Sequence, residues 1–161
     1  ELRKCQMQNE STLMTKPTRT HIKKKDQIAC YTKAIETKKY LFLTLNYSKF
    51  SKKMEEERPL LSPTELKNYI DCLELELGRK LSHYSSGEYG SKKNNPHYHI
   101  LLFGVTSDDI EDICATWTQG DVFAEAVPLR KIYKVVEYIG KGQSRHSLSN
   151  GKPFIMEKLD L

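Results

Sequence analysis

Several features that would assign the chain to a familiar class are missing from its sequence. There is no apolar run long enough to cross a bilayer and no charged-then-apolar leader of the secretory kind. The cysteines form no Cys-x-x-Cys pair, which argues against a zinc knuckle and against a disulfide-dense secreted scaffold. Internal repeats and low-complexity blocks are also lacking. We therefore expect a soluble protein with an ordinary hydrophobic core.

Length and charge are compatible with one domain and leave the type of partner open. The chain has 161 residues and a formal net charge of +5. A domain of about 150 residues buries roughly two-thirds of its unfolded surface, so folding requires no metal or disulfide. The positive charge permits a nucleic-acid partner but also suits a solvated surface. We divide the chain into a basic N-terminal arm, residues 1–25, and one domain, residues 26–161. The arm is either a solvated tail or a segment that contacts phosphates.

Hydrophobic periodicity and capping signals predict a mixture of strands and helices. Helices are expected over residues 26–38, over 63–77 behind the capping residue Ser62, from Thr106 past Trp117, and from Leu129 or Arg130 to Lys141. Strands are expected over 40–47, 81–88, 97–103 and 120–127, with a short edge strand near 154–156. This order favours an α+β fold, with a central antiparallel sheet of about five strands flanked by helices, of the ferredoxin-like or RNA-recognition type.

One stretch of the chain carries a pattern typical of metal binding. In an extended strand His97 and His99 project from one face, and a turn-rich segment would fold the preceding strand back so that Glu88 lies beside them. Two imidazoles and one carboxylate form a three-ligand set that leaves coordination positions open for water or substrate. The alternative is an ordinary pair of polar residues on a strand. The sequence therefore predicts a catalytic metal site at Glu88, His97 and His99.

A second group of residues lies in the last predicted helix. Tyr138 and Lys141 are three positions apart, which puts a phenol and an ammonium on the same side of a helix. Gly140 between them is unexpected in a helix interior and would let a bulky substrate approach the backbone. Alone, Tyr138 would be interpreted as a tyrosine at a helix–sheet interface with its hydroxyl hydrated.

Taken together, these motifs resemble those of a known superfamily. The strand Phe42-Leu43-Thr44-Leu45, then Glu88 with Pro96-His97-Tyr98-His99, then Tyr138-x-x-Lys141 are similar in order and spacing to the three motifs of the HUH endonucleases. The resemblance covers residues 40–141 and is strongest to rolling-circle replication initiators of the microvirus kind.

The resemblance implies an activity and a role for each site residue. Glu88, His97 and His99 would hold Mg²⁺ or Mn²⁺, and Tyr138 would attack single-stranded DNA at a replication origin. The products would be a 5′-phosphotyrosyl DNA and a free 3′-hydroxyl that a polymerase can extend. Lys141 would stabilise the phenolate or the scissile phosphate, because phosphodiester attack builds negative charge.

The chain departs from the microvirus pattern in one respect. Those initiators resemble one another in using two tyrosines four residues apart, whereas Lys134 occupies the position four before Tyr138. Tyr133, five residues before, would lie about 140° around the helix from Tyr138. A scheme with one tyrosine is therefore expected.

The remaining expectations concern DNA binding and partners. Lys92, Lys93, Lys134, Arg130 and Lys131 flank the site and would contact phosphates, although a solvated surface role suits each of them equally. For Tyr47 and Tyr89 we weigh base stacking against packing, and packing is favoured. Expected partners are single-stranded origin DNA and a host helicase and polymerase, in the cytoplasm of a bacterial host. The alternatives are a single-strand transposase or relaxase of the same superfamily, and a non-catalytic nucleic-acid-binding module.

Overall fold

A computed structural model describes residues 5–8, 24–48, 59–90, 95–141 and 151–159, and the structural statements that follow concern these residues. The strands are β1 (Cys5–Gln8), β2 (Tyr40–Asn46), β3 (Ser82–Tyr89), β4 (Pro96–Phe103), β5 (Val122–Glu125) and β6 (Phe154–Lys158). The helices are α1 (Lys24–Thr37), α2 (Pro63–Leu77), α3 (Ile110–Thr116) and α4 (Ile132–Gly140). Short 3-10 turns, η3 (Ser107–Asp109) and η4 (Leu129–Lys131), precede α3 and α4.

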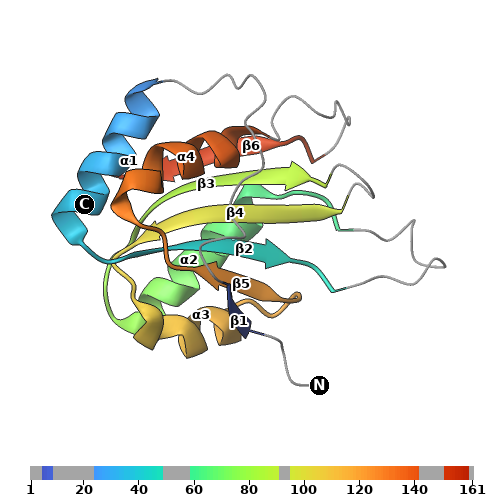
Figure 1. The fold of residues 1–161 in the computed structure, drawn as a ribbon. Coiled ribbons are helices and arrows are strands. Elements are labelled where there is room, and N and C mark those ends of the chain that lie inside the picture. The colour runs from blue at the N-terminus through green and yellow to red at the C-terminus, as the bar shows by residue number, and fades with distance from the viewer. Residues whose placement is uncertain (1–4, 9–23, 49–58, 91–94, 142–150, 160–161) are drawn as a thin grey trace.

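The described strands form one sheet in the order β1-β5-β2-β4-β3-β6 (Figure 1). From β5 to β6 every neighbouring pair is antiparallel, which confirms the predicted α+β class and its antiparallel sheet. β2 lies between β4 and β5, as expected for a strand that is apolar on both faces. β6 lies at one edge of the sheet, also as expected.

The N-terminal segment differs from its prediction. The sequence predicts a loosely ordered arm, but residues 5–8 form β1, which pairs in parallel with the outer edge of β5. Four polar and apolar residues are too few to show a strand period, so only the open edge of β5 identifies their partner. The other residues of the predicted arm up to residue 23 lie outside the described part of the chain.

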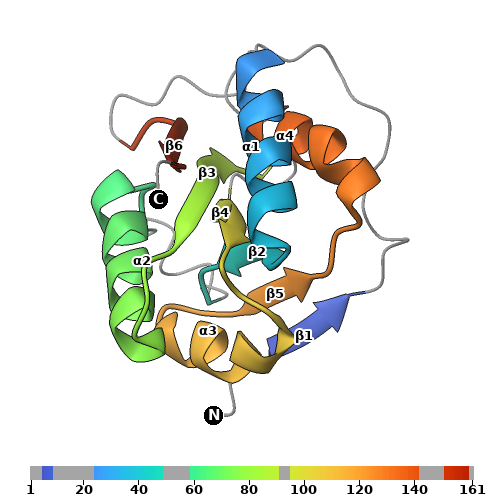
Figure 2. The same cartoon turned by 90° about the vertical axis from the view of Figure 1, so that its left-hand side faces the viewer.

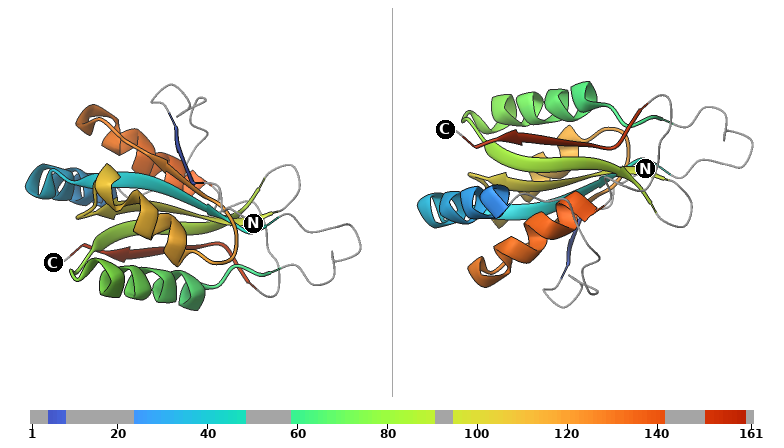
Figure 3. Two further views of the ribbon diagram at one scale, coloured as in Figure 1. Left: turned by 90° about the horizontal axis from the view of Figure 1, so that it is seen from below. Right: turned by 90° about the horizontal axis from the view of Figure 1, so that it is seen from above.

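Helices cover both faces of the sheet (Figures 2 and 3). On one face, α2 and α3 bury a core that includes Leu43, Tyr98 and Ile100. On the other face, α1 and α4 bury a second core that includes Phe42 and Leu101. Alternation along β2 and β4 therefore supplies both cores at once. Within the described ranges, no helix has the length and apolar character needed to span a bilayer.

The start of α2 is anchored to the end of β2. The Ser62 hydroxyl accepts a hydrogen bond from the Glu65 amide, as predicted for an N-cap. The side chain of Glu65 accepts a hydrogen bond from the Tyr47 hydroxyl at 2.5 Å, and no described contact returns it to the Ser62 amide as a full capping box would. α2 ends at Gly78, which adopts the left-handed conformation at φ 66°.

The hairpin of β3 and β4 has the predicted antiparallel arrangement. The Gly90 amide donates a hydrogen bond to the Asn95 carbonyl at 2.9 Å, which closes the hairpin. In the resulting register Glu88 lies opposite His97, and Ser86 lies opposite His99. All three predicted metal ligands therefore project from the face that α4 covers in part.

Two neighbouring serines of β3 have contrasting environments, although both are fully buried. Ser85 Oγ lies 2.7 Å from His83 Nδ1. Ser86 Oγ projects from the opposite face and has no hydrogen-bond partner in the described part of the chain. Because a buried hydroxyl without a partner carries a desolvation cost, Ser86 reduces stability where Ser85 adds to it.

Ser85→Ala and Ser86→Ala should therefore have different effects on folding. Loss of the Ser85 hydroxyl leaves His83 without its partner and should lower the free energy of unfolding by about 1–3 kcal/mol. Loss of the Ser86 hydroxyl should leave it unchanged or raise it. Urea denaturation of the two metal-free variants measures both values, and an equal decrease for both would contradict this account.

His83 should also make stability depend on pH. Burial, with a further decrease from Lys158, lowers the pKa of His83 to about 4, although Glu74 acts in the opposite direction. Below pH 6.5 the unfolded chain therefore binds a proton that the folded chain does not, so stability is full above that pH and declines down to about pH 4. Between pH 7 and pH 5, His83 should account for a decrease of about 2 kcal/mol. In urea titrations at both pH values, His83→Gln should show a smaller decrease than the parent protein, and an identical decrease would refute the assignment.

Candidate metal centre and active site

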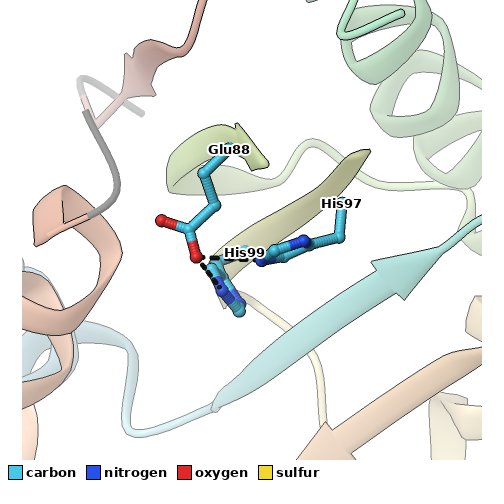
Figure 4. Close-up of side chains that lie close together, drawn as sticks. All are labelled: Glu88, His97 and His99. Atoms are coloured by element: carbon cyan, nitrogen blue, oxygen red, sulfur yellow. Dashed lines mark hydrogen bonds and ion pairs between the residues drawn. The ribbon is translucent and has the colours of Figure 1, made fainter. Parts of the chain in front are cut away.

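Glu88, His97 and His99 meet on one face of the sheet (Figure 4). Glu88 Oε1 lies 2.9 Å from His97 Nε2 and 2.9 Å from His99 Nε2. The three potential ligand atoms all lie within 4.8 Å of one another. His99 is buried, whereas His97 and Glu88 are partly accessible, so the group opens toward solvent on one side.

The outer nitrogens of both imidazoles have partners of their own. His97 Nδ1 lies 3.1 Å from the Asn95 carbonyl oxygen, which can only accept, so this nitrogen carries the proton. His99 Nδ1 lies 3.2 Å from the Thr44 hydroxyl, which can accept in the same way. In neutral rings the Nε2 atoms then present lone pairs to a carboxylate oxygen. A cation relieves this meeting of acceptors, so the donor set fits a divalent metal.

Electrostatics keep the group in the protonation states that a metal requires. Burial raises the pKa of Glu88, but hydrogen bonds and charge from His97 and His99 outweigh burial and lower it to about 2. Burial also lowers the pKa of His99, more than Glu88 raises it. A carboxylate and a neutral imidazole are therefore favoured, and these are the forms that bind metal.

Tyr138 lies against the buried histidine. Its ring centroid is 5.0 Å from that of His99 and 6.0 Å from that of Phe42. Phe42 in turn stacks on His99 at 5.6 Å with an interplanar angle of 19°. α4 holds Tyr138 there because its apolar side, Ile132, Val135, Val136 and Ile139, is buried in the core on this face.

Tyr133 points elsewhere, in agreement with its expected angle on the helix. Its ring centroid lies 5.4 Å from that of Tyr31 on α1, and the residue is 37% exposed. Of the two tyrosines of α4, only Tyr138 therefore contacts the histidines in the described structure.

The predicted cationic residues are placed less closely. Lys141 is the half-buried C-cap of α4, and Lys134 is exposed on the same helix. Arg130 is exposed in η4, and Lys131 is half-buried beside it. Lys92 and Lys93 lie outside the described residues, so their role in DNA binding stays a prediction.

Neither of the tyrosines considered for base stacking is available for it. Tyr47 donates its hydroxyl to Glu65, and its ring packs edge-on against Trp117. Tyr89 is only 4% exposed and donates to the Gly151 carbonyl at 2.6 Å. Packing, the favoured interpretation, is confirmed for both.

Sequence reasoning did not identify the residues that orient the histidines. Thr44 and Phe42 were interpreted only as parts of an apolar strand, yet both contact His99. The available signal was the single hydroxyl of Thr44 in the otherwise apolar run from Leu41 to Leu45. Its partner could not be known without the register of β2 against β4.

Comparison with known proteins supports the resemblance. The family model of replication-associated protein ORF2 matches residues 40–143. The chain is 26% identical to replication-associated protein VP4 of Bdellovibrio phage phiMH2K over 148 residues, which cover 78% of this chain and 46% of that protein. It is 34% identical to replication-associated protein ORF2 of Spiroplasma virus 4 over 58 residues, or 34% of this chain and 18% of that protein. The chain thus spans less than half the length of these relatives.

A solved structure shares the fold. The crystal structure of the hypothetical protein ORF119 from Sulfolobus islandicus rod-shaped virus 1 aligns with a TM-score of 0.51 at 20% identity, covering 77% of this chain and 99% of that one. The matched family segment runs from the first residue of β2 past the end of α4 and includes all three ligand candidates and Tyr138. The chain therefore belongs to the ORF2 family of replication-associated proteins.

Proposed function

We propose that this domain nicks single-stranded DNA at a replication origin, using Tyr138 as the nucleophile beside a divalent metal held by Glu88, His97 and His99. The observation that carries the proposal is the contact between the Tyr138 and His99 rings, whose centroids lie 5.0 Å apart. A metal site and a phenol in contact are the two parts that transesterification of a phosphodiester requires. Membership of a replication-associated family supports the same activity.

The reaction exchanges one phosphoester bond for another. Tyr138 Oη forms a bond to the scissile phosphorus as the bond from phosphorus to the 3′ oxygen breaks, and the 3′ oxygen gains a proton while the phenol loses one. The products are a 5′-phosphotyrosyl strand and a free 3′-hydroxyl suitable for extension by a polymerase. Mg²⁺ or Mn²⁺ at the site would offset the negative charge on the non-bridging oxygens.

The protein's own residues would prepare this step. Glu88 and His97 hold the accessible side of the site, while His99 is fixed by Thr44 below and Phe42 on its face. Phe42 and His99 together limit the positions open to the Tyr138 ring. Lys141, one helical turn after Tyr138, would stabilise the phenolate or the scissile phosphate, with Lys92, Lys93 and Lys134 contacting the DNA backbone.

Three alternatives are less well supported. A non-catalytic binding module gives no reason for three ligand atoms to converge within 4.8 Å. Relaxases of the resembling superfamily carry the tyrosine ahead of the histidine pair, and here it follows. Single-strand transposases exchange the tyrosine helix between subunits, whereas α4 packs against Phe42 and Leu101 of its own sheet. We infer that the partners are origin DNA and a host helicase and polymerase, in the cytoplasm of a bacterial host.

Tyr138→Phe should abolish covalent attachment to a single-stranded origin oligonucleotide in Mn²⁺ while binding remains nearly unchanged, because only the attacking oxygen is removed. Denaturing electrophoresis detects the adduct, and anisotropy of a labelled oligonucleotide measures binding. Tyr133→Phe, a matched change on the same helix, should form the adduct normally. Adduct formation by the Tyr138→Phe protein would disprove the assignment.

His97→Ala and His99→Ala should each remove metal-dependent nicking, because two remaining ligands are too few to hold the ion. In the parent protein Mn²⁺ should raise the melting temperature, since it binds the folded site, and in both variants that rise should be lost. His83→Gln, a buried histidine on the opposite face, should keep the full response. An unchanged Mn²⁺ response in both alanine variants would show that the metal binds elsewhere.

A further inference from the structure

The face that carries the metal ligands continues across the sheet from β4 onto β2 and β5. Two cross-strand rows define it. One row is formed by Asn46, His97 and Glu88, and the other by Phe123, Thr44, His99 and Ser86. Residues in direct cross-strand register project from the same face, so Asn46 and Phe123 stand beside the ligand group. Both rows therefore begin with a residue that has had no role so far.

Phe123 contributes little to the fold. Its neighbours Val122 and Ala124 are buried in the core under α2 and α3, whereas Phe123 is only half-buried and projects from the other face. Among the described residues it packs with neither core cluster and makes no aromatic contact. A large apolar ring in this position has surface available for a ligand.

Asn46 is held firmly through its backbone, while its side chain remains available. Its amide donates to the Asp121 carbonyl at 2.9 Å, and its carbonyl accepts from Trp117 Nε1 at 2.9 Å. The side-chain amide makes no hydrogen bond to the described residues. Gly120 adds to the rigidity, because a Cβ there would lie 2.1 Å from the Asn46 carbonyl oxygen. The carboxamide is thus presented from a fixed strand end, directly opposite His97.

We propose that Phe123 and Asn46 form a subsite for one unpaired nucleobase of the DNA strand whose phosphate lies at the metal ligands. An uncharged aromatic face and a carboxamide suit a base rather than a phosphate, because the ring can stack on the base while the amide bonds to its edge. Stacking tolerates any base, so Phe123 contributes affinity and Asn46 contributes selectivity. This inference rests on the proposed function, since it assigns the nucleotide that flanks the cleaved bond.

The position of α4 agrees with this direction for the strand. α4 places Tyr138 over Phe42 and His99, so that part of the face is covered by the helix. Along β2, Phe42 is buried, whereas Thr44 and Asn46 are partly accessible, so access increases toward the proposed subsite. A strand bound at the ligands can therefore continue over Asn46 and Phe123 without displacing the helix.

The test uses a pool of single-stranded oligonucleotides, randomised in sequence and incubated with Mn²⁺ and the full chain. Covalent adducts are recovered and sequenced for the parent, for Asn46→Ala and for Tyr133→Leu, which removes an exposed aromatic ring elsewhere on α4. Asn46→Ala should still form adducts but lose the base preference at one position near the cleaved bond. Tyr133→Leu should keep the parental preference.

Binding is measured separately from chemistry, in the Tyr138→Phe background and with the oligonucleotide that the parent prefers. Adding Phe123→Leu should weaken binding by about tenfold or more, as expected for loss of one base stack, while the Mn²⁺ thermal shift stays unchanged. Parental preference with Asn46→Ala together with parental affinity with Phe123→Leu would overturn the subsite. If the parent binds single strands in a Phe123-dependent way but forms no adduct, the nicking activity fails and the subsite stands. If the parent binds no single strands, both fail.

Discussion

The candidate site depends on the register between β3 and β4. Because Glu88 lies directly opposite His97, one carboxylate oxygen reaches both imidazoles at 2.9 Å. A slip of one residue would turn Glu88 to the opposite face of the sheet and separate the three ligands. The hydrogen bond between the Gly90 amide and the Asn95 carbonyl helps fix that register, and the same Asn95 carbonyl orients His97. The turn therefore closes the hairpin and sets the direction of one ligand.

Burial on both faces of the sheet gives the site its rigidity. Alternate residues of β4 enter different cores, so His99 lies between strands whose other side chains are tightly packed. Thr44 and Phe42, both from the central strand β2, contact His99. Only the His97 end of the same face is partly accessible. A substrate must therefore approach from that end, which is where Asn46 lies.

Polar groups on this face are arranged at a cost to stability. Glu88 is held as a carboxylate although burial opposes its charge, and His99 is held neutral although Glu88 favours its protonation. Ser86, in the same row as His99, is buried without a partner in the described chain. On the opposite face the comparable buried polar pair, His83 and Ser85, is satisfied. Such unsatisfied arrangements are common where a site awaits a ligand.

Much of this protein could be predicted from its sequence because the signals are local. Strand alternation assigned His97 and His99 to one face, the turn residues brought Glu88 to them, and helical spacing excluded Tyr133 from sharing the site with Tyr138. The antiparallel sheet and the cap at Ser62 follow from the same kind of pattern. Other features depend on register between segments that are distant in the chain, and no local pattern encodes it. The pairing of β1 with β5, the contacts of Thr44 and Phe42 with His99, and the approach of Tyr138 to 5.0 Å were therefore decided only by the packing of strands and helices.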